Sequence, residues 1–186
     1  MSQIARIILR LLGWNIYVRV PLDQYPKAVI IMAPHTSNLD FVIGRLGFYL
    51  HGLPPKILIK KEAFRHVLGF LLRKMGGIPV DRGHSQNTVK KITREFHRHE
   101  RFYLLITPEG TRSLVKQWKK GFYFIALTAK VPVFLGFLDY RKKEGGIGML
   151  LHPTGDFEAD FKIIQDFYRD KHGRHPSKFN LSSGVA

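Results

Sequence analysis

The sequence predicts a single-domain α/β fold with a largely parallel or mixed central sheet flanked by helices. Two observations lead to this fold class. Short apolar runs rich in β-branched residues alternate along the chain with segments of helical periodicity, which is the pattern of strands and helices built around a sheet. The chain has 186 residues, of which 45% are hydrophobic, so it can form one domain with a buried core. No internal repeat, long linker or low-complexity block divides it.

The predicted strands are the short apolar runs, because a continuous run of four to eight apolar residues indicates a buried strand. The first spans 28–33, where the sequence reads AVIIMA, and Pro34 and His35 end it. Further strands are expected at 56–59, 78–80, 102–106, 133–137 and 147–151.

The predicted helices fall between these strands. Ser37 or Asn38 can cap a helix that runs to about Tyr49. Further helices are expected at 63–75, 86–99, 119–130 and 158–171. The polar, Ser-rich residues 176–186 are expected to form a flexible tail.

Residues 3–14 predict a short amphipathic helix at the N-terminus. Five aliphatic residues fall on one face at helical spacing, and Arg6 and Arg10 lie on the other. Such a helix fits either an interfacial membrane helix or an ordinary helix packed on the domain. We expect residues 1–20 to be an amphipathic membrane-association segment. No apolar run reaches the ~18–20 residues of a spanning helix, and no convincing secretory signal is present.

The net charge is +16, from 30 Lys and Arg against 14 Asp and Glu. Such an excess indicates an anionic partner, namely nucleic acid, anionic lipid headgroups or a phosphorylated ligand, although it can also serve solubility alone. The sequence shows no zinc-finger, RRM-like or basic-zipper signature. Cysteine is absent, which excludes disulfides and a cysteine nucleophile.

Three polar clusters each follow the end of a predicted strand. They begin at His35, Asp81 and Pro108. Ligands of open α/β sheets bind outside the carboxyl ends of the strands, so the three clusters are expected to share one crevice if the sheet is mostly parallel.

His35 and Asp40 suggest a catalytic pair. The histidine lies in a turn just before a helix, and Asp40 lies in the first turn of that helix. This geometry can bring the carboxylate to one imidazole nitrogen and leave the other free to act as a base. Neither a Gly-x-Ser-x-Gly motif nor a cysteine is present. A hydroxyl of the substrate can therefore take the place of the serine. Both residues also have structural readings, as a turn histidine and as a helix N-terminal acid.

The other two clusters suggest an anion site. Arg82 and Arg112 carry guanidinium groups suited to phosphate oxygens, and Gly110 allows the backbone to approach a ligand. Lys60 and Lys120 can add a basic rim. Glu109 is an acid in this basic setting, and it can orient an arginine or accept a hydrogen bond from a ligand hydroxyl. The alternative is a network of weak surface ion pairs.

These residues form ordered blocks that resemble the 1-acyl-glycerol-3-phosphate acyltransferase family, the lysophospholipid acyltransferases, in a short bacterial form. The matching blocks are His35 and Asp40 (His-x4-Asp), Gly77 to Arg82, the unchanged Glu109-Gly110-Thr111-Arg112, and Val131-Pro132-Val133. The resemblance covers about residues 28–140. Known members are longer and carry a more hydrophobic N-terminal anchor, and the second and fourth blocks depart from the frequent pattern.

The resemblance implies transfer of a fatty acyl group from acyl-CoA or acyl carrier protein to a lysophospholipid hydroxyl, with no metal or organic cofactor. By this analogy His35 is the general base and Asp40 its partner. Arg82, Glu109, Gly110, Thr111 and Arg112 would bind the acceptor, with residues 21–175 as the acyltransferase domain. Backbone N–H groups near the helix after Asn38 are expected to stabilise the oxyanion.

The expected partners are therefore the acyl donor, the lysophospholipid acceptor and an anionic membrane surface, with no nucleic acid. The expected location is peripheral, on the cytoplasmic side of the cell membrane. The alternative is a basic module that binds nucleic acid or anionic lipid without catalysis.

Overall fold

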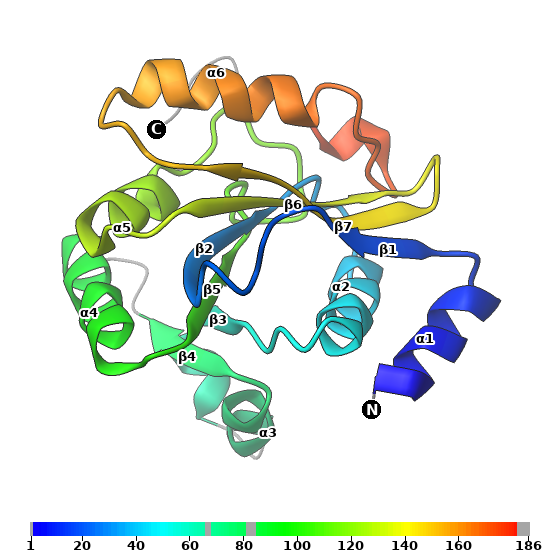
Figure 1. Cartoon of the computed structure of the whole chain (residues 1–186), viewed down its shortest axis with the longest axis horizontal. Helices are drawn as coiled ribbons and strands as arrows, with labels where there is room; N and C mark the ends of the chain where they lie inside the picture. The colour runs from blue at the N-terminus through cyan, green and yellow to red at the C-terminus, as the bar shows by residue number, and fades with distance from the viewer. Residues whose placement is uncertain (1, 66–67, 81–84, 182–186) are drawn as a thin grey trace.

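The computed structural model describes residues 2–65, 68–80 and 85–181. In this part of the chain, seven strands form one twisted sheet in the order β1-β7-β6-β2-β5-β3-β4 (Figure 1). The strands are β1 (Asn15–Val18), β2 (Lys27–Met32), β3 (Lys56–Lys60), β4 (Gly77–Val80), β5 (Phe102–Ile106), β6 (Val133–Asp139) and β7 (Glu144–Leu151). The β6–β7 pair is antiparallel and the other neighbouring pairs are parallel. The mixed α/β fold predicted from the sequence is confirmed.

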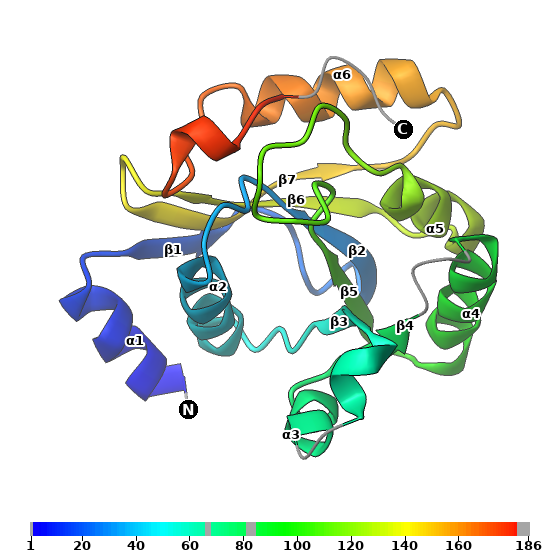
Figure 2. The ribbon, with the colours of Figure 1, turned by 180° about the vertical axis from the view of Figure 1, so that it is seen from behind.

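Helices cover both faces of the sheet. They are α1 (Ser2–Leu11), α2 (Leu39–Leu50), α3 (Leu68–Lys74), α4 (Ser85–Arg98), α5 (Gly121–Ala129) and α6 (Phe157–Tyr168). Figures 1 and 2 show α6 on one side of the sheet and α1, α2 and α3 on the other.

Alternate residues of β2 are buried toward opposite layers, because successive side chains of a strand point to opposite faces. Val29 and Ile31 belong to the main core with side chains of α4, α5 and α6, whereas Ala28 and Ile30 belong to a second core with Phe48 of α2. A strand buried on both faces reads as a continuous apolar run, which is why the sequence identified β2 so clearly.

Two elements differ from the sequence prediction. Strand β1 was not predicted, and it pairs in parallel with β7 at the edge of the sheet. The segment predicted as one helix at 63–75 instead begins with a 3-10 turn, Lys61–Phe64, and continues as the shorter helix α3. A Cβ atom at Gly69 would lie 2.3 Å from the carbonyl oxygen of Phe64, so this close approach of the backbone depends on glycine.

The predicted tail is described as far as residue 181. There the turn Pro176–Lys178 leads to Phe179, whose ring lies 6.1 Å from that of Trp118. Gln165 Nε2 donates to the carbonyl oxygen of Leu181 at 2.8 Å. Residues 176–181 thus contact the core and α6, and 182–186 lie outside the described residues.

Helix α1 packs on the domain through few buried side chains, and most of its aliphatic side chains face outward. Ala5 and Leu9 are buried. Ile4, Ile7, Ile8, Leu11 and Leu12 are between 37% and 82% exposed. The apolar face of this helix is therefore not the face that packs against α2. Among the described residues, no helix combines the length and the apolar character that crossing a membrane requires.

The β1–β7 pairing predicts a sharp sensitivity to substitution at Gly146. Its φ is 132°, and a Cβ atom would lie 1.7 Å from the carbonyl oxygen of Tyr17 on β1. We expect Gly146→Ala to lower the free energy of unfolding by at least ~2 kcal/mol, because β1 must move away from β7. Urea unfolding measures the change. Gly121→Ala is the control, since a Cβ atom there meets nothing within 4 Å. Equal unfolding midpoints for both variants would contradict this view of the β1–β7 edge.

Candidate active site

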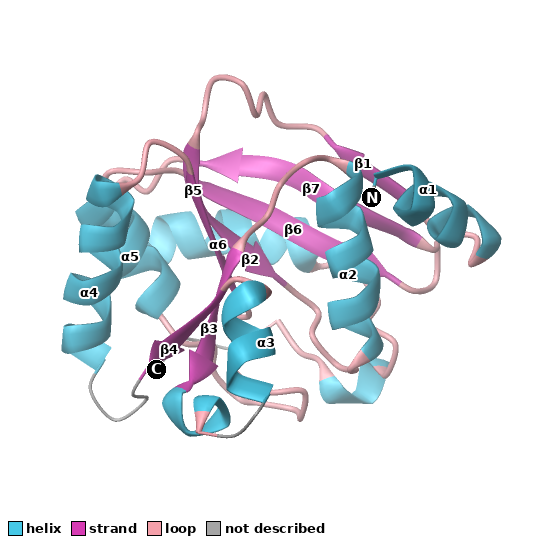
Figure 3. Cartoon of the chain, turned by 90° about the horizontal axis from the view of Figure 1, so that it is seen from below, coloured by secondary structure: helices cyan, strands magenta, loops and turns pink. Residues whose placement is uncertain are grey.

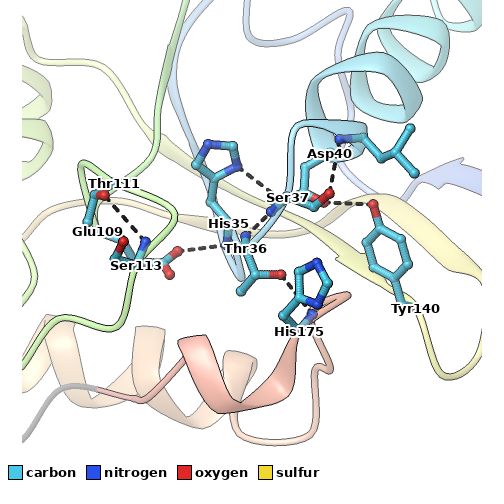
Figure 4. A network of polar contacts seen from close by, with 10 residues as sticks. His35, Thr36, Ser37, Asp40, Glu109, Thr111, Ser113, Tyr140 and His175 are labelled. Carbon is cyan, nitrogen blue, oxygen red and sulfur yellow. Dashed lines mark hydrogen bonds and ion pairs between the residues drawn. The ribbon is translucent and has the colours of Figure 1, made fainter.

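Two loops meet at the carboxyl ends of β2 and β5. The two strands are parallel neighbours, so the segments that follow them leave the sheet side by side. The backbone N–H of His35 donates to Oε1 of Glu109 at 2.8 Å and joins the two loops (Figure 4). The structure thus brings together the first and third of the predicted clusters.

The predicted pair of His35 and Asp40 is in contact. Nδ1 of His35 lies 3.1 Å from Oδ2 of Asp40 (Figure 4). A carboxylate only accepts hydrogen bonds, so Nδ1 carries the proton and Nε2 has a free lone pair. The His35 side chain is 20% exposed, whereas that of Asp40 is 2% exposed. One edge of the imidazole therefore faces a buried acid, and the ring stays accessible.

Asp40 is held by four donors. The N–H groups of Thr36 and Ser37 donate to Oδ2 at 2.8 and 2.9 Å, beside Nδ1 of His35. The hydroxyl of Tyr140 donates to Oδ1 at 2.7 Å. Burial raises the pKa of Asp40, but the hydrogen bonds from His35, Tyr140, Ser37 and Thr36 outweigh it and hold this pKa below its ordinary value. The carboxylate is therefore ionised at neutral pH and can stabilise an imidazolium.

The local sequence explains this arrangement. Pro34 follows β2 after a cis peptide bond, and the chain then turns through residues 35–38 into α2. Asn38 occupies the N-cap position but makes no side-chain cap hydrogen bond. The carboxylate of Asp40 instead reaches back to the amides of the turn. The C-terminal segment supports the same turn, since the N–H of His175 donates to Oγ1 of Thr36 at 3.1 Å.

Four further N–H groups of this turn and of the start of α2 already have acceptors. Besides those of Thr36 and Ser37, the N–H of Leu39 donates to Oγ of Ser37, and the N–H of Phe41 donates to the carbonyl of Asn38. These four N–H groups are therefore not free to stabilise an oxyanion in this structure, as had been expected of amides at the start of α2.

Glu109 is buried, with 2% of its surface exposed. Burial raises its pKa to about 8; the hydrogen bond from the His35 amide opposes this rise, and the charge of Asp40 adds to it. The predicted contact of Glu109 with an arginine or a ligand hydroxyl stays a prediction, and in the structure its Oε1 accepts from a backbone amide. This contact fixes the position of His35 relative to β5.

The remaining predicted residues are less closely grouped. Gly110 has a φ of 69°, and Thr111 Oγ1 accepts from the N–H of Ser113 at 3.3 Å. Arg112 is exposed on the same loop. Lys120 lies with its Nζ 4.9 Å from the centre of the Phe157 ring.

Two further predicted residues are not placed at the site by the structure. Arg82 lies outside the described residues, and Lys60 is the last residue of β3. Their predicted roles in binding an anion stay predictions.

A cavity of about 150 Å³ opens beside the histidine. It is lined by Met32, His35, Asp40, Phe41, Gly44, Arg45, Phe48, Ile57, Leu105 and Thr107. Most of this lining is apolar, and it comes from α2 and from the strands β2, β3 and β5. Trp118 and Phe122 do not line this cavity and are buried in the main core.

Sequence reasoning missed two residues of the site. Arg45 lines the cavity, and two of its guanidinium nitrogens, Nε and Nη1, are buried with no hydrogen-bond partner among the described residues. Phe41 and Arg45 lie four residues apart on α2, so helical spacing places both on the face of the helix that lines the cavity. Tyr140 lies 100 residues from Asp40, and no local pattern announces their contact.

Comparison with known proteins shows the family of the chain. A family model described as Acyltransferase matches residues 17–134, which is more than half of the chain. The chain therefore belongs to the acyltransferase family.

Two individual proteins show the likeness in more detail. The chain is 27% identical over 137 residues to a probable 1-acyl-sn-glycerol-3-phosphate acyltransferase of Mycoplasma pneumoniae (strain ATCC 29342 / M129 / Subtype 1). The match covers 70% of this chain and 52% of that relative, so the chain spans about half the length of the relative. The fold is similar to the crystal structure of the 1-acyl-sn-glycerophosphate acyltransferase PlsC from Thermotoga maritima. The TM-score is 0.56 at 19% identity, covering 89% of this chain and 74% of that chain.

The raised pKa of Glu109 predicts a pH-dependent stability. Between pH 5 and 8 the unfolded chain has released this proton and the folded chain retains it, so the free energy of unfolding falls as the pH rises. We expect Glu109→Gln, which stays neutral and still accepts the His35 amide, to remove a fall on the order of 1–4 kcal/mol. Urea unfolding at pH 5 and pH 8 measures it. Asp23→Asn, at an exposed carboxylate, is the control, and an undiminished fall in Glu109→Gln would refute the assignment.

Proposed function

We propose that this protein transfers a fatty acyl group from a thioester, acyl-CoA or acyl carrier protein, to the free hydroxyl of a lysophospholipid. The acceptor that best fits is 1-acyl-glycerol-3-phosphate. The observation that carries the proposal is the accessible imidazole of His35, with Nδ1 3.1 Å from the buried carboxylate of Asp40 and the ring lining a mostly apolar cavity. Family membership supports an acyl-transferring enzyme.

The proposed reaction uses the two nitrogens of His35 differently. Nε2 removes the proton of the acceptor hydroxyl as its oxygen attacks the thioester carbonyl carbon. A tetrahedral intermediate forms, and the imidazolium is stabilised through Nδ1–H by the ionised Asp40. The intermediate then collapses, the carbon–sulfur bond breaks, and the imidazolium returns its proton to the leaving thiolate. The ester bond forms without a covalent enzyme intermediate.

Cationic groups near the site support an anionic acceptor. The relative of Mycoplasma pneumoniae is named for 1-acyl-sn-glycerol-3-phosphate, which carries a phosphate monoester. Arg112 is exposed on the loop that follows Glu109, and Arg45 lines the cavity itself. Guanidinium groups suit phosphate oxygens because they donate two parallel hydrogen bonds. Arg82 and Lys60 are proposed to add to this site on the resemblance alone.

We further propose that the protein docks on an anionic membrane surface, on the cytoplasmic side, through α1 and its neighbours. The aliphatic side chains of α1 face outward, and Phe70 of α3 is 76% exposed. Figure 3 shows α1, α2 and α3 on the side nearest the viewer, with α6 behind the sheet. Arg6 and Arg10 lie at the flank of α1, along a cavity of about 310 Å³ that Trp14 and His51 also line. Outward apolar residues beside basic ones are typical of interfacial helices.

The catalytic assignment is tested with labelled acyl donor and purified protein. We expect His35→Ala to lower kcat by about 10²–10⁴-fold, because it removes the general base. Asp40→Asn is expected to lower kcat as well, since the imidazolium loses its counter-charge. His152→Ala is the control, at an exposed histidine whose ring contacts Tyr25. Near-full transfer by a folded His35→Ala protein would refute the mechanism.

The same assay tests the two substrates. Acyl-CoA and acyl carrier protein are compared as donors. A lysophospholipid with a phosphate monoester is compared with one whose phosphate is esterified to choline. Transfer to the choline ester but not to the monoester would contradict the proposed acceptor.

The docking surface is tested by flotation with vesicles that contain anionic phospholipid. We expect Ile7→Ser with Leu11→Ser to weaken binding by about 10–100-fold, because two aliphatic side chains no longer enter the interface. Binding of the unmodified protein is expected to weaken at high salt. Ile163→Ser on α6 is the control, at an aliphatic side chain that is 44% exposed on the opposite side of the sheet. Unchanged flotation of the double variant would exclude α1 as the docking helix.

A further inference from the structure

Tyr140 contacts the carboxylate oxygen of Asp40 that His35 does not use. Its hydroxyl donates to Oδ1 at 2.7 Å, while Nδ1 of His35 and two backbone amides share Oδ2 (Figure 4). Tyr140 follows directly after β6, which β2 separates from β5 in the sheet. This contact therefore comes from a third part of the sheet, beyond the two loops that meet at His35 and Glu109.

The contact with Tyr140 satisfies one side of a buried carboxylate. A buried acceptor without a donor is destabilising, so loss of the hydroxyl leaves Oδ1 unpaired within the described structure or lets the carboxylate turn. Burial and the contact with Asp40 raise the pKa of Tyr140 above its ordinary value, although Arg174 opposes this rise. The hydroxyl therefore stays protonated at physiological pH and remains a constant donor.

The ring of Tyr140 is held in turn by the N-terminal segment. It packs edge-on against Trp14, with ring centroids 5.0 Å apart and an interplanar angle of 87°. Trp14 follows α1 and is buried in a small cluster with Leu9 of α1, Ile43 of α2 and Leu138 of β6. The backbone N–H of Tyr140 donates to the carbonyl of His172 at 2.8 Å. A continuous chain of contacts thus runs from α1 through Trp14 and Tyr140 to Asp40.

We propose that Tyr140 is a positioning residue that holds the Asp40 carboxylate in the plane of the His35 imidazole, and that Trp14 keeps Tyr140 in place. The N-terminal segment then completes the active site in addition to docking the protein on a surface. This inference rests on the proposed function of His35 and Asp40. It assigns to residues 14 and 140 a role that none of the four sequence blocks carries.

Tyr140→Phe isolates the hydroxyl, because the ring and its contact with Trp14 remain. We expect kcat to fall about tenfold with unchanged KM for donor and acceptor, since only the alignment of the catalytic pair is lost. We expect the acidic limb of the plot of kcat against pH to move to higher pH. A carboxylate with one hydrogen-bond donor fewer interacts more strongly with the protonated form of His35 and so favours it. Among the described residues, Glu109 and Arg174 interact electrostatically with this cluster, and Arg45 lines the same cavity as His35 and Asp40. Tyr103→Phe is the matched control, since it removes a hydroxyl that donates to the carbonyl of Tyr25.

Trp14→Ala tests the link to the N-terminal segment. We expect a similar fall in kcat with a short-chain acceptor presented in detergent micelles, where vesicle docking plays no part. Gln3→Ala is the control on α1, because this side chain is exposed and belongs to none of the described core clusters. It is expected to keep the rate in micelles. A Trp14→Ala protein that folds and keeps the full rate in micelles would overturn the supporting role of the N-terminal segment.

A readout independent of turnover separates this inference from the proposed function. In protein labelled with ¹⁵N-histidine, NMR follows the titration of the His35 ring, whose signal His35→Ala identifies by its disappearance. We expect Tyr140→Phe to move the midpoint of this titration to higher pH and Tyr103→Phe to leave it unchanged. An unchanged midpoint together with an unchanged kcat in Tyr140→Phe overturns the inference. Full activity of His35→Ala would instead overturn the proposed function, whatever the titration shows.

Discussion

The structure of the site depends on one buried carboxylate. Asp40 accepts hydrogen bonds from the imidazole of His35, from two amides of the preceding turn and from the hydroxyl of Tyr140. Each donor lowers the free energy of the ionised form, and together they outweigh the cost of burying it. The same carboxylate shapes the turn between β2 and α2 and fixes the tautomer of His35. The hydrogen bonds that form this turn therefore also orient the His35 imidazole.

The sheet supplies the framework for this arrangement. Strand β2 lies at its centre between β5 and β6, and all three run in the same direction. The segments that follow them carry His35 and Asp40, Glu109, and Tyr140. Contacts between parallel strands thus hold three distant parts of the sequence at one edge. The buried Glu109 adds to this by accepting a hydrogen bond from the amide of His35, which links the turn after β2 to the loop after β5.

Much of this could be predicted from the sequence, because the signals are local. The apolar run of β2 and the five-residue spacing of His35 and Asp40 fix a strand, a turn and the start of a helix. Strand β1 was not predicted because it is only four residues long and lies at the edge of the sheet. Its pairing with β7 is a long-range contact that no local pattern indicates. The contact of Tyr140 with Asp40 was not predicted either, because it is also a long-range contact. The contact of Glu109 with the His35 amide was not predicted, because a backbone amide leaves no mark in the sequence.

The central claim is that Nε2 of His35 faces the hydroxyl that becomes acylated. A crystal structure with bound 1-acyl-glycerol-3-phosphate, in the absence of a donor, measures this directly. The account predicts that the free hydroxyl oxygen lies about 2.6–3.2 Å from Nε2, with Nδ1 still bonded to Asp40. A bound acceptor whose hydroxyl lies far from the imidazole, or an Nε2 occupied by a protein group in the complex, would contradict it.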